Sequence, residues 1–235
     1  MTSRTNRSDQ LVGLHSNPAD AMLLRICASV AVLGAVLLIA SNILGSLLLD
    51  NHDWVADTVS DLAAGQLEII QDFGLYGYGA ALIALAIGAA HIRMPGRGWT
   101  VSIFALALLA ACVTVIGARN EYGDGDNEGV EIHIYLVYGL GVLFAVLFFA
   151  AARGLGRIIP RYRTISILCG VAWTVAAPLF FILPTSVDGA WERGLGLITC
   201  VWVVVVAAAF WRLARPAEDA IVVRSVLHPT DAAKT

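Results

Sequence analysis

The sequence predicts an all-α, polytopic membrane protein, a six-transmembrane-helix bundle with both termini cytoplasmic. Six apolar runs each reach the ~20 residues that a helix needs to cross a ~30 Å hydrocarbon layer. The hydrophobic fraction is 58% and the charged fraction is 14%, which is too apolar for a soluble domain of 235 residues. The connecting loops alternate between basic and acidic. Because Lys and Arg stay on the cytoplasmic side, the acidic loops are expected to face outward.

Each run is expected to form one helix, and the six helices together one membrane domain, residues 21–213. The runs cover residues 21–49, 68–92, 99–118, 131–152, 164–183 and 190–213. Helices are favoured over a barrel because barrel strands show only a weak alternation over ~10 residues. The segments 1–20 and 214–235 are expected to be cytoplasmic tails too short to fold alone. The protein is therefore predicted to be a multi-pass protein of the cell membrane.

The distribution of charged residues sets the orientation. Arg93 and Arg97 separate the second and third runs, and four arginines, at 153, 157, 161 and 163, separate the fourth and fifth. Acidic residues dominate the other three connections. This alternation predicts three acidic loops on the outer side.

Cofactor chemistry finds little support in the spans. Lys234 is the only lysine and lies in the tail, so a Schiff base to a cofactor inside the membrane is excluded. His91 and His133 lie at span ends on opposite sides, so they cannot share one haem iron. The four cysteines lie singly inside spans and are expected to be apolar packing residues. We expect no cofactor, no nucleic-acid partner, and contacts with membrane lipids.

The first acidic loop, residues 50–65, has a four-residue repeat of aspartates. Asp53, Asp57 and Asp61 would share one face of a short interfacial helix, anchored by Trp54 and ended by Gly65. Three aligned carboxylates repel one another, so a cation is expected nearby. A solvated acidic face is the alternative interpretation.

The start of the last run supplies such a cation. Arg193 and Arg119 are the arginines of the outer side, and Arg193 directly follows Glu192. Because adjacent residues do not face each other on a helix, Arg193 is expected to reach a carboxylate from another element. The candidates are Asp57, Asp61 and Asp72. The alternative to a ligand site is a structural clamp between loop and bundle.

The middle acidic loop, residues 121–133, matches the first half of a calcium-binding loop. Asp124, Asp126, Glu128 and the following glycine fit the spacing, but the twelfth position is Tyr135, where a bidentate Glu is required. A mobile acidic loop with weak cation affinity is favoured over a true calcium site.

Small and polar residues inside the spans indicate helix packing. Gly74, Gly77 and Gly79 in the second span, and the step from Ala190 to Gly194 in the sixth, are expected to bring backbones close together. Asn42 in the first span is expected to form an interhelical hydrogen bond.

Three short motifs resemble a known family. They are Thr58-Val59-Ser60-Asp61-Leu62, Glu131-Ile132-His133 and Gly189-Ala190-Trp191-Glu192-Arg193. The pattern, spread over most of residues 21–213, is similar to the bacterial and archaeal family called domain of unknown function 998, related to the DRAM/FRAG-like six-helix proteins. The resemblance implies a six-helix fold and a polar site without naming an activity. The site residues that it implies are Ser60, Asp61, His133, Glu192 and Arg193.

Two hypotheses of function follow. The first is a non-enzymatic protein that binds a small polar or lipid headgroup ligand at the outer helix ends, for transport or sensing. Its expected ligand-binding residues are Asp57, Ser60, Asp61, His133, Glu192 and Arg193. The alternative is an intramembrane metal-dependent hydrolase that uses His52, His133 and a carboxylate, with Ser60 at the substrate. The weak metal-ligand candidates are His52, Asp124, Asp126 and Glu128. Binding without catalysis is favoured.

Overall fold

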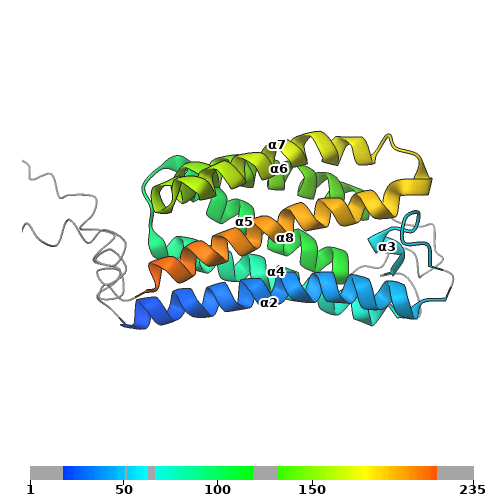
Figure 1. Ribbon diagram of the computed structural model, residues 1–235, viewed down its shortest axis with the longest axis horizontal. Coiled ribbons are helices and arrows are strands. Elements are labelled where there is room, and N and C mark those ends of the chain that lie inside the picture. The colour runs from blue at the N-terminus through cyan, green and yellow to red at the C-terminus, as the bar shows by residue number, and fades with distance from the viewer. Residues whose placement is uncertain (1–17, 51, 63–66, 119–131, 216–235) are drawn as a thin grey trace, which may run out of the picture.

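The computed structural model describes residues 18–50, 52–62, 67–118 and 132–215. Its elements are α2 (Pro18–Leu48), α3 (Val59–Leu62), α4 (Glu68–Ile92), α5 (Arg97–Ala118), α6 (Ile132–Ile158), α7 (Pro160–Phe180), the 3₁₀ turn η1 (Thr185–Val187) and α8 (Asp188–Leu213). Within these ranges, six helices are long and apolar enough to cross a membrane, and no strand occurs. The protein is therefore an all-helical, integral membrane bundle, as the sequence predicts (Figure 1).

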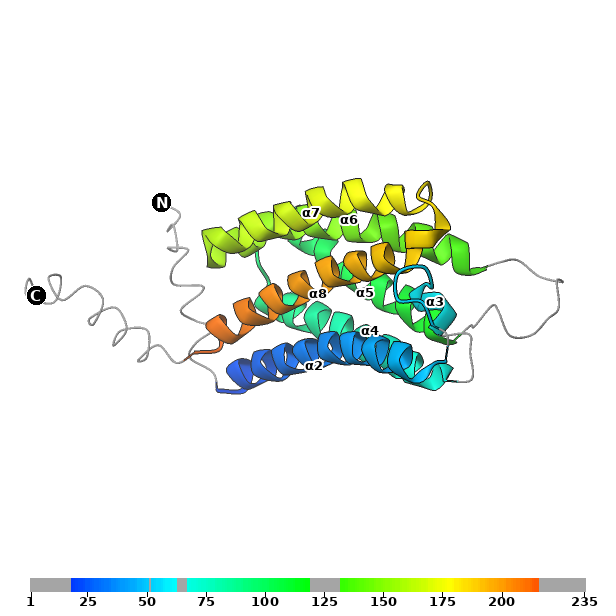
Figure 2. The ribbon, with the colours of Figure 1, turned by 45° about the vertical axis from the view of Figure 1, so that its right-hand side comes forward.

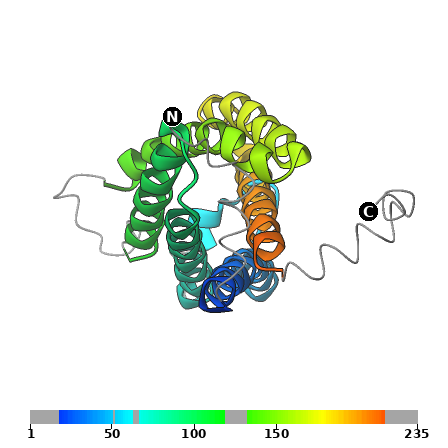
Figure 3. The same cartoon turned by 90° about the vertical axis from the view of Figure 1, so that its left-hand side faces the viewer.

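The six long helices form a closed ring. Each packs against its neighbours in the order α2, α4, α5, α6, α7, α8 and back to α2, which the view along the bundle shows (Figure 3). Helix α8 also contacts α4 and α6. We call the end of the bundle that holds α3 the α3 end. The start of α2 and the end of α8 lie together at the opposite end (Figure 2).

Helices α2 and α4 approach closely because glycines face each other between them. A Cβ atom at Gly34 would lie 2.2 Å from the carbonyl oxygen of Gly77, and one at Gly74 would lie 1.9 Å from Ser41 Oγ. The expected packing by glycines of the second span is thus confirmed. The expectation for Gly194 was wrong: a Cβ there would meet no atom within 4 Å, because this face of α8 is open.

Large side chains fill the half of the ring away from α3. Phe148, Trp202 and Phe210 are fully buried, and the rings of Phe148 and Trp202 lie 5.6 Å apart between centroids. Trp202 Nε1 donates a 2.9 Å hydrogen bond to Ser166 Oγ. Phe210 packs so tightly on Gly88 that a Cβ there would lie 2.2 Å from the ring. This half of the bundle therefore has a solid core.

The aspartate-rich segment differs from the predicted interfacial helix. Instead of one helix, residues 53–57 form a turn and α3 forms a single helical turn. Asp53 Oδ1 accepts the backbone N–H of Val55 (2.8 Å), and Asp61 Oδ2 accepts that of Thr58 (2.7 Å). Short aspartate side chains compete with helical hydrogen bonds in this way. The N–H donors of Val55 and Ala56 also hold the pKa of Asp53 below its ordinary value.

Candidate ligand-binding site

A cavity of about 540 Å³ lies inside the ring at the α3 end. All six long helices contribute to its wall, and the segment 54–60 lines it at the α3 end. The wall is mostly aliphatic and aromatic, with Val113, Val137, Phe144, Trp173 and Phe180 among its residues. Small-molecule sites in proteins usually measure roughly 300–1,000 Å³ and share this apolar character.

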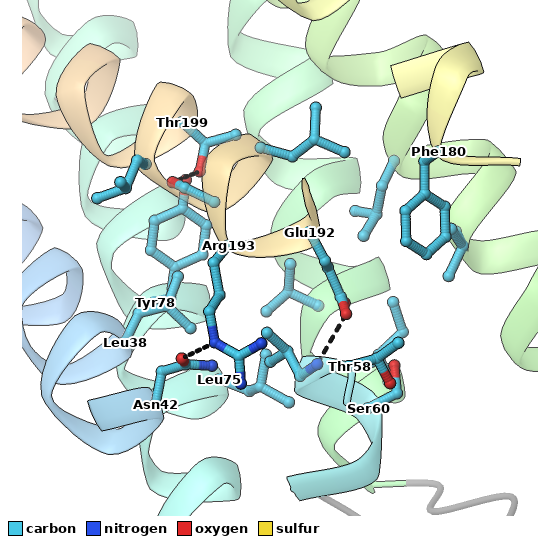
Figure 4. A pocket seen from close by; sticks show the side chains of 18 of the residues that line it. Leu38, Asn42, Thr58, Ser60, Leu75, Tyr78, Phe180, Glu192, Arg193 and Thr199 are labelled. Carbon is cyan, nitrogen blue, oxygen red and sulfur yellow. Dashed lines mark hydrogen bonds between the residues drawn. The ribbon is translucent and has the colours of Figure 1, made fainter. Parts of the chain in front are cut away.

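Polar groups of the cavity gather toward the α3 end. They are Asn42, Thr58, Ser60, His133, Glu192 and Arg193. Deeper in the cavity the hydroxyl of Tyr78 points toward Thr199 (Figure 4). The cavity thus has a polar head region and an apolar body.

The start of α8 holds segment 54–60 in place over the cavity. The backbone N–H groups of Gly189 and Ala190 donate to the carbonyls of Ala56 (3.2 Å) and Val55 (3.0 Å). A Cβ at Gly189 would lie 2.0 Å from the carbonyl oxygen of Asp57, so only glycine permits this approach.

Arg193 is the centre of this attachment, because all five of its N–H donors have acceptors within the protein. Nε donates to Asn42 Oδ1 (2.9 Å), Nη1 to the carbonyls of Trp54 (3.0 Å) and Asp57 (2.8 Å), and Nη2 to Ser46 Oγ (3.3 Å) and His52 Nε2 (3.0 Å). The guanidinium carbon also lies 4.4 Å from the centroid of the Trp54 ring. The bond to Asn42 confirms the interhelical hydrogen bond expected there (Figure 4).

The acceptors of Arg193 differ from those expected. Within the described part of the chain, no carboxylate oxygen lies within 4.0 Å of its guanidinium. Asp57 contributes its backbone carbonyl, while its carboxylate faces His52. The reason is local: the aspartates are occupied in capping the turns of their own segment, and neutral carbonyl dipoles take over the solvation of the cation. The geometry is that of a clamp between loop and bundle.

His52 connects this clamp to Asp57. Its side chain is only 1% exposed. Because arginine only donates, Nε2 of His52 accepts, which leaves the proton on Nδ1, 3.4 Å from Asp57 Oδ2. His52 is thus a structural link between Arg193 and Asp57.

Glu192, the residue before Arg193, also lines the cavity. Its Oε2 accepts the backbone N–H of Val59 at 2.7 Å, the one hydrogen bond that this carboxylate makes to residues the structure describes (Figure 4). Beside it, Ser60 Oγ and His133 Nε2 lie 3.5 Å apart. This contact brings the first loop to the start of α6, across 73 positions of sequence.

Four of the six predicted ligand-binding residues therefore line one cavity: Ser60, His133, Glu192 and Arg193. Asp57 and Asp61 instead line an open depression on the outside of the segment, together with Asp188. Asp124, Asp126 and Glu128, three of the weak metal candidates, lie outside the described residues. Among the described residues, no three His, Cys, Asp or Glu side chains are grouped as metal ligands.

Sequence reasoning missed the cavity itself. Its wall includes Gly141 of α6 and Gly196 of α8, where an added Cβ would meet no atom within 4 Å. Both belong to a Gly-Leu-Gly triplet, at 139–141 and 194–196. Two such triplets in helices that face one interior were the available signal, because glycine leaves space that a side chain would fill.

Comparison with known proteins identifies one family. The family described as Protein of unknown function (DUF998) matches residues 32–209, so the chain belongs to that family, as its motifs indicated. No curated protein and no solved structure gives a significant match to the chain.

Proposed function

We propose that this member of the DUF998 family binds an amphipathic small molecule, with its polar head at the α3 end and its apolar part in the cavity. The observation that supports this most directly is the cavity's division into polar and apolar regions. Ligands are usually oriented by a few polar groups in a mainly apolar site. Such a site would serve transport or sensing of a lipid-like compound.

The proposal separates the roles of the polar residues. Arg193 has no free N–H donor, so it positions the segment 54–60 and does not contact the ligand head. Glu192, Ser60 and His133 are the proposed contacts. The hydrolase alternative gains no support, since His52 is engaged by Arg193 and Asp57.

We further propose that the α3 end faces outward from the cell membrane. The basis is the charge asymmetry: among the described residues, the opposite end holds Arg93, Arg97, Arg153, Arg157 and Arg161. A ligand would then enter from the outside or from the outer leaflet.

Native mass spectrometry with dodecanol, a neutral single-chain amphiphile, tests the binding proposal. Gly196→Leu should fill the cavity and abolish the bound adduct, since this glycine lines it. Gly194→Leu is the matched control, because it lies on the same helix, has equal space, and is absent from the cavity wall. Gly141→Leu repeats the test from α6.

We expect one saturable dodecanol per wild-type molecule and per Gly194→Leu molecule, and none for the two cavity variants. The proposal is overturned if the wild type binds no dodecanol, or if all four proteins bind it equally.

A further inference from the structure

Glu192 is a carboxylate with unused acceptor capacity at the head of an apolar cavity. Two carboxylate oxygens offer about four acceptor sites, and the hydrogen bond from Val59 uses one of them. Glu192 lines the cavity, as does Ser60 beside Val59. A group that donates hydrogen bonds would therefore find two acceptors here.

The surrounding charge favours a cation over an anion. The acidic residues that the structure describes at the α3 end are Asp50, Asp53, Asp57, Asp61, Glu68, Asp72, Asp188 and Glu192. Against these stands one described cation at this end, Arg193. An acidic mouth attracts cations and repels anions.

Arg193 cannot reverse this preference by direct contact. An arginine that recognises a carboxylate or phosphate head must offer N–H donors to it. Every N–H of Arg193 is already donated to a protein acceptor, and one face of its guanidinium lies against Trp54. An anionic head would therefore meet Glu192 without a free donor from this arginine.

We propose that the ligand is a long-chain amine: its primary ammonium head pairs with Glu192 and donates to Ser60 Oγ, and its alkyl chain fills the cavity. This inference rests on the proposed function and specifies its ligand class. Pairing with the ammonium compensates the Glu192 charge, which is otherwise costly at the edge of an apolar space. A neutral alcohol would leave that charge uncompensated by the ligand, so it should bind less tightly.

Three probes with the same chain and different heads test this inference: dodecylamine, dodecanol and dodecanoate. Native mass spectrometry at neutral pH measures their affinities for the wild type, for Glu192→Gln and for Asp188→Asn. Asp188 is the control because it is an acidic residue of the same end that does not line the cavity.

We expect the wild type to prefer the amine over the alcohol by at least about tenfold, since a buried charge pair is worth that much or more. Glu192→Gln should remove this preference, because the charge that distinguishes the two heads is gone, whereas Asp188→Asn should retain it.

Three results would each overturn the inference while the proposed function stands. The wild type binds amine and alcohol equally, or it binds dodecanoate most strongly, or the preference for the amine survives Glu192→Gln. If no probe binds, both fail. The wild-type series decides the outcome even if Glu192→Gln does not fold.

Discussion

At the scale of single residues, Arg193 shows how a guanidinium near the membrane edge is stabilised without a carboxylate. Neutral carbonyl, amide, hydroxyl and imidazole acceptors take its five N–H donors, and an indole ring covers it. The sequence predicted that Arg193 needs partners, because an unpaired arginine in a membrane is costly. It did not predict which partners, since backbone carbonyls leave no signal in side-chain patterns.

Arg193→Ala should lower the free energy of unfolding by about 2–4 kcal/mol, because it leaves the carbonyls of Trp54 and Asp57 without their donor. Combined with Asn42→Ala, the loss should be less than additive, since Asn42 accepts from Arg193 Nε. Thermal unfolding in detergent measures both.

The control for this coupling is Asp20→Asn, which removes the 3.1 Å pair with His91 at the opposite end of the bundle. Its effect should add to that of Arg193→Ala. Additive behaviour with Asn42→Ala as well would show that Arg193 merely extends into water.

At the scale of elements, the six helices were predictable and their connections were not. Long apolar runs locate the spans because length and hydropathy are set by the bilayer. The observed helix ends differ from the predicted ones where polar residues continue the helix: α6 extends through Arg157, and α7 begins at Pro160. The segment 53–62 was predicted as a helix from its four-residue repeat, but aspartates favour capped turns over helix interiors.

The contact between α2 and α4 gives a prediction about helix spacing. Gly34→Ala should destabilise the protein by about 1–3 kcal/mol, since its Cβ would overlap the carbonyl of Gly77. Gly139→Ala in α6 is the matched control: its Cβ would meet nothing within 4 Å, so better helix propensity should leave stability equal or higher. Melting temperatures in detergent compare the two, and equal effects would refute tight packing at Gly34.

At the scale of the whole molecule, the ring of helices brings distant motifs to one place. Ser60 comes from α3, and His133 and Glu192 come from the starts of α6 and α8, yet all three border one cavity. Their polarity at span ends, together with the family resemblance, pointed to them in the sequence. The apolar body of the cavity left no signal beyond the two Gly-Leu-Gly triplets, because lipid-facing and cavity-facing residues of a span are equally hydrophobic.

The orientation of the molecule is testable by cysteine labelling in intact cells. Ser186→Cys lies exposed at the α3 end and should react with a membrane-impermeant maleimide. Arg161→Cys, exposed at the opposite end, should react only after permeabilisation. The reverse pattern would place the cavity mouth in the cytoplasm and withdraw the proposed outward site.

The contact between Phe210 and Gly88 has a consequence for any movement of a ligand. With α8 seated against α4 at that point, large side chains close the bundle at the end opposite α3, beyond the cavity. Under the proposed function, an amphiphile in the cavity would be retained or reported, and its passage to the opposite end would be blocked at this contact. Passage would require α8 to swing away from α4, and a crosslink between cysteines at positions 88 and 210 would then stop flux while leaving occupancy intact.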